Sequence, residues 1–168
     1  MALRTVLKEG DPSLRKKARE IKRFDERLAE LAADMIETMH HENGVGLAGP
    51  QVGILKRIFV MNVDEEEGDQ VFINPRIVKS EGCQNEAEGC LSLPGLYGYV
   101  ERPETLTLEY QNLDGEHCSM EAEGLKAICI AHESDHLDGV LFRDLAPKGL
   151  FRLNDEGEPI PEEVDIFL

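Results

Sequence analysis

Long hydrophobic runs are missing from this 168-residue sequence. No apolar stretch approaches the roughly 18 residues that a membrane-spanning helix requires, so we expect no contact with a membrane. Residues 1–8 also lack the extended apolar core of a secretory signal peptide. Together these absences predict a cytoplasmic protein.

Positive charge is scarce. The chain has 18 Lys and Arg residues against 34 Asp and Glu residues, which gives a formal net charge of −16. Because such a surface repels phosphate backbones, we expect no direct nucleic-acid binding. Acidic runs such as residues 64–67 are typical of solvated surface.

Paired cysteine motifs are absent as well. The four cysteines, at positions 83, 90, 118 and 129, form no Cys-x-x-Cys pair, which argues against a zinc ribbon or a thioredoxin-type centre. A cytoplasmic location also argues against disulfides. We expect Cys83 and Cys118 to be small buried hydrophobic residues, whereas Cys90 is a candidate for chemistry.

The pattern of predicted elements favours an α+β fold. Apolar spacing predicts a helix over residues 26–41 with Asp25 as its N-cap, and a second helix over residues 123–137. Residues 57–63, 70–73 and 105–110 have the composition of strands, the second of them ended or placed at an edge by Pro75. The order lacks strand–helix alternation. We therefore predict mixed or antiparallel sheets packed around the second helix, in one domain of residues 1–168 with an acidic tail from about residue 153.

The second predicted helix contains a His-Glu-x-x-His motif. His132 and His136 are four residues apart, so they share one helical face at about 6 Å and can bind one metal ion. Glu133 can then reach a water molecule on that ion. Buried histidines can also serve only as hydrogen-bonding core residues, but the motif favours a metal-dependent hydrolase. Asp135 and Asp138 are candidates to orient the two histidines.

A catalytic metal site needs a third protein ligand. No histidine follows His136, although Asp144 and later acidic residues are available. Upstream, Cys90 follows a glycine, Gly89, that would let the backbone come close to an ion. A Cys-His-His set suits Fe²⁺, Zn²⁺, Co²⁺ or Ni²⁺.

A glycine-rich segment spans residues 44–53. It lacks the Gly-Lys-Ser/Thr of a phosphate-binding loop and follows a helix instead of a strand, so phosphate binding is poorly supported. The segment could be a flexible connector. We favour a closely packed loop in which the side-chain amide of Gln51 donates a hydrogen bond to an oxyanion.

Three segments together resemble the peptide deformylase family. They are residues 44–51 (GVGLAGPQ), 88–92 (EGCLS) and 132–136 (HESDH), in the family's order. The resemblance implies that Cys90, His132 and His136 hold a metal ion, which is Fe²⁺ in the cell. It also implies that Glu133 is the general acid/base, and that Gln51 and the backbone N–H of Leu91 bind the oxyanion. The implied reaction removes the formyl group from N-formylmethionine at the start of nascent chains and releases formate.

The same resemblance suggests a pocket for the methionine end of the substrate. The candidate residues, for which ordinary core packing is an equally good interpretation, are Val45, Gly46, Gly89, Tyr97, Leu125, Ile128 and Cys129. The chain differs from the usual family pattern at a few neighbouring positions, which are Gly49, Tyr97, Ala131 and Ser134.

The end of the chain differs from many bacterial members, which finish in a basic helix that docks on the ribosome. Residues 159–168 are acidic and contain two prolines, so a transient ribosome contact would not use such a helix. A closing strand at a sheet edge is an alternative.

Two other functions also fit the motifs: a metallo-amidase or peptidase for another acyl group, and an impaired protein that binds metal and formyl-Met peptide without turnover.

Overall fold

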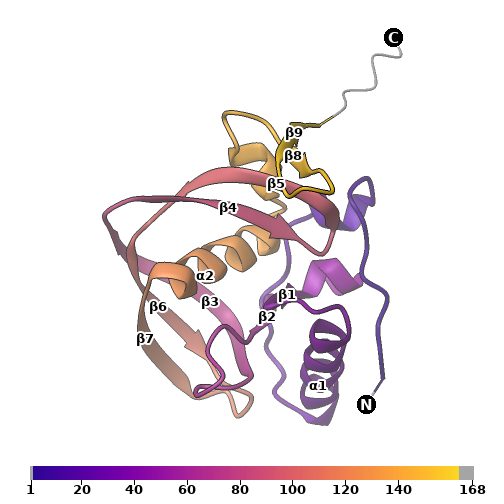
Figure 1. Ribbon diagram of the computed structural model, residues 1–168. Helices are drawn as coiled ribbons and strands as arrows, with labels where there is room; N and C mark the ends of the chain where they lie inside the picture. Colours follow the sequence, from indigo (N-terminus) through magenta and orange to yellow (C-terminus); the bar gives the residue numbers. More distant parts are fainter. Residues whose placement is uncertain (1, 163–168) are drawn as a thin grey trace.

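Two antiparallel sheets enclose one helix in the computed structural model, which describes residues 2–162. The helix, α2 (Gly124–Leu137), lies between the sheets, and α1 (Glu26–His41) lies on the outside of one of them (Figure 1). This arrangement confirms the predicted α+β fold. Within residues 2–162, none of the helices combines the length and the apolar character that crossing a membrane would require.

The larger sheet has five strands in the order β1-β2-β3-β6-β7. Every neighbouring pair is antiparallel. The strands are β1 (Gly46–Ala48), β2 (Ile58–Met61), β3 (Gln70–Glu81), β6 (Thr105–Gln111) and β7 (His117–Glu123). In β2, Phe59 faces the cluster that includes α2 whereas Val60 faces the cluster that includes α1, so both faces of this strand are buried.

The smaller sheet has four strands in the order β4-β5-β8-β9 and is also antiparallel. The strands are β4 (Gln84–Cys90), β5 (Leu93–Arg102), β8 (Phe151–Leu153) and β9 (Pro159–Pro161). Three 3-10 helices complete the fold: η1 (Pro12–Arg15), η2 (Gly49–Val52) and η3 (Phe142–Leu145). Pairing of Tyr97 with Phe151 adds β8 to the edge of β5, and β9 pairs with β8, so residues 159–161 form the edge strand that the alternative of a closing strand anticipated. Of the acidic end, residues 163–168 lie outside the described part of the chain.

Helix α1 forms as its sequence predicts. The Asp25 side chain accepts a hydrogen bond from the backbone N–H of Leu28 at 3.1 Å, which satisfies one of the free donors at the helix start. Leu31, Met35 and Met39 recur at helical spacing, and all three are buried. The predicted boundaries, residues 26–41, are those of the structure.

Helix α2 is buried almost all round. Residues 127–133 are all buried, because the two sheets cover opposite sides of the helix. The structure begins the helix one residue later than predicted, at Gly124, and Gly139 ends it with a left-handed φ of 74°. Such a helix can present polar side chains to a site only where the packing leaves a cavity.

Pro75 does not end β3, but the pairing of β3 with β2 stops at Ile73, so Pro75 lies where that side of β3 is an edge, which is the second form of the prediction. Strand β3 continues to Glu81, with a register shift between Ile73 and Arg76. Asn74 has a φ of 50°, and its side chain exchanges two hydrogen bonds with the backbone of Ile21, each at 2.8 Å. This irregularity lets the strand pass a residue that has no N–H to donate.

The glycine-rich segment is structured, which removes the interpretation as a flexible connector. It contains β1 and η2. A Cβ atom at Gly49 would lie 2.7 Å from the carbonyl oxygens of both Ile54 and Lys56. A methyl group at position 49 would therefore collide with the backbone of residues 54–56, which accounts for glycine at this position.

Cysteine burial partly contradicts the sequence analysis. All four cysteines are free, but Cys83 is exposed and Cys118 is half-buried. The prediction of a buried residue was wrong for Cys83 because it follows the turn residue Gly82, beside Glu101 and Glu104.

Candidate metal centre and catalytic site

Two elements bring the three predicted metal ligands together. Helix α2 supplies His132 and His136, and Cys90 is the last residue of β4, after a register shift that follows Gly89. Their ligand atoms all lie within 4.8 Å of one another. The Cys90 Sγ is 3.3 Å from Nε2 of His136. A spacing of this kind suits one metal ion bound between a thiolate and two imidazoles.

A buried carboxylate orients His132. Oε1 of Glu88 is 2.9 Å from Nδ1 of His132, which leaves Nε2 of that ring directed at the site. Arg102 donates two hydrogen bonds to Glu88, at 2.8 and 3.0 Å. Burial raises the pKa of Glu88, but the hydrogen bonds from His132 and Arg102 outweigh it and hold the pKa below its ordinary value.

The two aspartates predicted to orient the histidines have other partners. Oδ2 of Asp135 accepts a hydrogen bond from Arg102 at 2.6 Å, so Asp135 acts on His132 only through Arg102 and Glu88. Asp138 forms an ion pair with Arg57 at 3.0 Å. The alternative third ligand, Asp144, is paired with Arg15 and is not part of the metal-ligand cluster.

The charges around the three ligands fit a cation. Burial lowers the pKa of His132, but hydrogen bonds to Cys90 and Glu88 raise it well above its ordinary value. Burial, reinforced by the charge of His132, holds the pKa of His136 well below its ordinary value. Positive charge is thus favoured beside Cys90 and Glu88 and disfavoured on His136. A divalent ion satisfies both conditions, so these residues fit a metal.

Glu133 is buried next to the ligands without a partner. Its Oε1 has no hydrogen-bond partner within residues 2–162, and its Oε2 lies so close to Gly46 that a Cβ atom there would overlap it. Burial raises the pKa of Glu133 to about 7, although the nearby His132 opposes the shift. A carboxylate with this pKa can both accept and release a proton near neutrality.

The amide of Gln51 has a fixed orientation. Its Oε1 accepts a hydrogen bond from the N–H of Ala48 at 2.9 Å, so its Nε2 must point the other way. That Nε2 donates to Oγ of Ser92 at 3.1 Å and lies 3.5 Å from Sγ of Cys90. Leu91 follows Cys90 at the same wall of the cavity. A hydrogen-bond donor is therefore held beside the metal ligands.

A cavity of about 520 Å³ opens onto the site. All seven residues predicted to contact substrate line it, namely Val45, Gly46, Gly89, Tyr97, Leu125, Ile128 and Cys129. Val45 and Leu125 are 48% and 60% exposed, so ordinary core packing does not account for them. Ile128 and Cys129 are buried and belong to both the core and the cavity wall. Burial raises the pKa of Cys129 to about 12, which keeps it a neutral thiol.

The sequence analysis missed several residues that support the site. Glu88 and Ser92 flank Cys90 within the EGCLS segment, so the sequence shows that they are close to it. The sequence does not show that Glu88 bonds His132 or that Ser92 bonds Gln51. Arg102 and Lys8 carried no local signal, because they reach the site only through the folding of the β4–β5 hairpin and of the N-terminal segment.

Comparison with known proteins agrees with this geometry. The family model for polypeptide deformylase matches residues 3–149. The chain is 49% identical over 161 residues to a peptide deformylase from Finegoldia magna, covering 93% of this chain and 99% of the relative. It is 53% identical over 148 residues to one from Clostridium botulinum, covering 88% and 99%. The crystal structure of the Thermotoga maritima peptide deformylase superimposes with a TM-score of 0.83 at 44% identity, covering 85% of this chain and 97% of that one. The chain therefore belongs to the peptide deformylase family.

Proposed function

We propose that Cys90, His132 and His136 hold one divalent metal ion and that Glu133 is the general acid/base of the reaction. Members of the family are metal-dependent enzymes that remove the N-formyl group from formylated nascent peptides, and this is the activity of the protein. The observation that carries the proposal is the buried carboxylate of Glu133, whose Oε1 has no hydrogen-bond partner in the described part of the chain and which lies beside a thiol and two imidazoles.

A bound metal ion supplies Lewis-acid chemistry, because it lowers the pKa of a coordinated water and polarises a carbonyl group. Glu133 accepts a proton from the water that attacks the formyl carbon, and then gives that proton to the departing amine nitrogen. The C–N bond breaks, and the products are formate and a peptide with a free N-terminus.

Gln51 and Leu91 stabilise the negative charge that forms on the formyl oxygen. The Nε2 of Gln51 and the backbone N–H of Leu91 are the proposed donors, each of which is worth about 3–4 kcal/mol in the transition state of such reactions. Because Ala48 fixes the Gln51 amide, this donor needs little reorganisation when the charge develops.

The cavity fits the methionine end of the substrate. We propose that its apolar wall, formed by Val45, Leu125, Ile128, Cys129 and Tyr97, holds the methionine side chain. Gly46 and Gly89 line it with backbone, so a peptide can approach closely there. A formyl carbon carries only hydrogen, and a narrow site therefore excludes larger acyl groups.

The proposed native metal is Fe²⁺, and Zn²⁺, Ni²⁺ and Co²⁺ are expected to occupy the same ligands. Metal analysis of anaerobically purified protein should find about one iron per chain. Air should then inactivate that protein through oxidation of iron or of Cys90. An air-stable enzyme that contains only zinc would contradict the assignment.

Formate release from a formyl-Met peptide tests the catalytic roles. We expect release by the metal-loaded protein and none above background with Glu133→Ala. Cys90→Ala should lose stoichiometric metal, whereas Cys83→Ala, which changes an exposed cysteine, should retain it. Undiminished release by Glu133→Ala, or full metal occupancy in Cys90→Ala, would refute the corresponding role.

Family membership supports deformylation over the two alternatives, another metallo-amidase or peptidase and a binding protein without turnover. A cytoplasmic location and a transient ribosome contact remain predictions. Residues 151–161 form the β8–β9 hairpin, so this part of the chain would contact a ribosome as a hairpin and not as a basic helix. Salt-dependent co-sedimentation with ribosomes tests the contact, and the absence of any co-sedimentation at low salt would contradict it.

A further inference from the structure

Three consecutive residues near the N-terminus each hold a different part of the oxyanion pocket. The N–H of Leu7 donates to the carbonyl oxygen of Gln51 at 2.7 Å, and the N–H of Glu9 donates to that of Ser92 at 2.8 Å. Between them, Nζ of Lys8 donates to the carbonyl oxygen of Leu91 at 3.1 Å. We call residues 7–9 the N-terminal strap.

The strap joins two segments that belong to different sheets. Gln51 lies in η2, which follows β1 of the five-stranded sheet, whereas Leu91 and Ser92 form the turn between β4 and β5 of the other sheet. The side chains of Gln51 and Ser92 also share a hydrogen bond at 3.1 Å. The relative position of the two proposed oxyanion donors therefore depends on what joins these two segments. The strap bonds to both of them, once to Gln51 and twice to the turn between β4 and β5.

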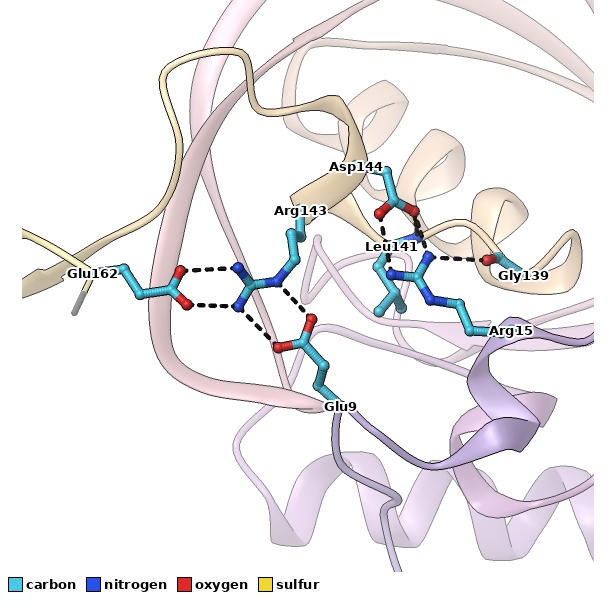
Figure 2. A network of polar contacts seen from close by, with 7 residues as sticks. All are labelled: Glu9, Arg15, Gly139, Leu141, Arg143, Asp144 and Glu162. Atoms are coloured by element: carbon cyan, nitrogen blue, oxygen red, sulfur yellow. Dashed lines mark hydrogen bonds and ion pairs between the residues drawn. The ribbon is translucent and has the colours of Figure 1, made fainter. Parts of the chain in front are cut away.

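The strap is fastened at Glu9 by an arginine. Nε and Nη2 of Arg143, in η3, donate to the two carboxylate oxygens of Glu9 at 2.6 and 2.8 Å. The same guanidinium donates to both oxygens of Glu162, each at 2.9 Å (Figure 2). Arg143 thus links the strap to the residue that follows β9.

A second arginine fastens the chain beyond the strap. Nη2 of Arg15 donates to Asp144 at 3.1 Å, and its Nη1 donates to the carbonyl oxygen of Gly139 at 3.3 Å (Figure 2). Asp144 in turn accepts a hydrogen bond from the N–H of Leu141 at 3.0 Å. Residues 9–15 are therefore tied to η3 at both ends, which fixes where the strap crosses the site.

We propose that the N-terminal strap positions the two halves of the oxyanion pocket, with Lys8 as a positioning residue for Leu91 and Arg143 as the group that holds the strap in place. The proposal rests on the oxyanion roles of Gln51 and Leu91 stated above. It gives a function in the reaction to residues that contact neither the metal ligands nor Glu133.

The expected loss of reaction rate distinguishes this role from a contribution to the stability of the fold. Lys8, Glu9 and Arg143 are partly exposed, and exposed ion pairs or hydrogen bonds contribute at most about 1 kcal/mol to folding. Oxyanion donors must lie within a few tenths of an ångström of their optimum, and a displacement of about 1 Å can lower a rate on the order of a hundredfold. Loss of a strap contact should therefore affect catalysis more than stability.

Lys8→Met tests the proposal directly, because it removes the donor to Leu91 and keeps the aliphatic stem. We expect kcat for formate release to fall about tenfold while KM stays within about twofold, since the lost interaction matters in the transition state. The melting temperature should change little. Lys8→Arg should restore most of kcat because it again offers a cationic donor. A raised KM with unchanged kcat would show that Lys8 contacts substrate instead and would overturn the proposal.

Arg143→Ala tests the fastening, with Arg76→Ala as the matched control. Arg76, on β3, forms an exposed ion pair with Glu109 on β6 at 3.7 Å, and it touches neither the strap nor the cavity. We expect a several-fold loss of kcat for Arg143→Ala and none for Arg76→Ala. Wild-type kcat in both the Lys8→Met and the Arg143→Ala variant would refute the strap. The proposed function itself fails only if the wild type releases no formate or if Glu133→Ala remains active.

Discussion

Two arginines in this protein each bridge a pair of carboxylates, and their surroundings differ. Arg102 lies between Glu88 and Asp135 and is 5% exposed, whereas Arg143 lies between Glu9 and Glu162 and is 31% exposed. The bond patterns are similar, since each guanidinium makes a two-bond contact with at least one carboxylate. Burial therefore decides what each cluster does.

At Arg102 the charges cannot be left unpaired. Glu88 is buried and also bonds His132, so removal of the arginine would leave an ionised carboxylate in a medium that solvates it poorly. At Arg143, water can replace a lost partner. The buried cluster therefore fixes the candidate metal ligand His132 and the stability of the fold together, whereas the surface cluster can adjust geometry with little effect on stability.

The largest expected effect is on stability. Arg102→Ala should lower the free energy of unfolding by about 3–5 kcal/mol, the usual consequence of breaking a buried ion pair on one side. Urea unfolding at constant metal occupancy measures it, and Arg102→Lys should be intermediate because it keeps the charge but loses the two-bond contact. A loss below about 1 kcal/mol would remove the distinction between the two clusters.

A second effect separates the clusters through metal affinity. Glu88→Gln should weaken metal binding about 10–100-fold, because Glu88 orients His132 and raises the basicity of its ring. The matched change Glu162→Gln, in the surface cluster, should leave affinity unchanged. Competition with a chelator measures both variants, and equal affinities in the two would contradict the role given to Glu88.

A smaller effect concerns salt. Arg143→Ala should cost less than about 1 kcal/mol of unfolding free energy, and this cost should nearly vanish in about 1 M NaCl, where screening acts over about 3 Å. The cost of Arg102→Ala should persist at the same salt concentration, because its partners are buried. Denaturation of both variants at low and high salt provides the comparison. Parallel salt dependence would show that burial does not distinguish them.

The smallest effect is the titration of Asp144. The hydrogen bond from Arg15 holds the pKa of Asp144 below its ordinary value, although slight burial opposes this. Its stabilising contribution is therefore complete above about pH 4, the ordinary pKa of aspartate, and is lost as the pH falls through the lowered value. In Arg15→Gln the pKa should return toward the ordinary value. NMR titration of the carboxyl carbon tests this, and an unchanged pKa would assign the shift to another cause.

Local patterns in the sequence were enough to predict α1, the position of α2 and the two histidines of the candidate metal centre, which the structure places together with Cys90. The spacing of Leu31, Met35 and Met39 and the cap at Asp25 depend only on near neighbours along the chain. The His132–His136 spacing is likewise local to one helix. The chemistry of a catalytic metal asks for a third ligand but left Asp144 and later acidic residues as alternatives, and the resemblance to peptide deformylases singled out Cys90.

Other features depend on distant partners and could not be read in this way. Strand β7 was not predicted because its sequence, HCSMEAE, contains no β-branched residue and no Phe, Tyr or Trp, and it becomes a strand through its pairing with β6. The continuation of β3 past Pro75 could not be predicted, because the bulge beside Pro75 is held by Ile21, more than fifty residues earlier. The Glu88–Arg102 pair and the contact of Lys8 with Leu91 likewise form only when separate segments meet.

The burial of α2 has a consequence for the order in which the protein becomes active. Residues 127–133 are covered by strands from both sheets, so this helix cannot be held in place until those strands have paired. His132 also stacks on Phe142, which follows the helix in sequence. During synthesis the site therefore assembles only after α2 and η3 have emerged, late in the chain. An enzyme that removes formyl groups from new polypeptides is thus itself without a complete site until its own residues 124–145 have been made.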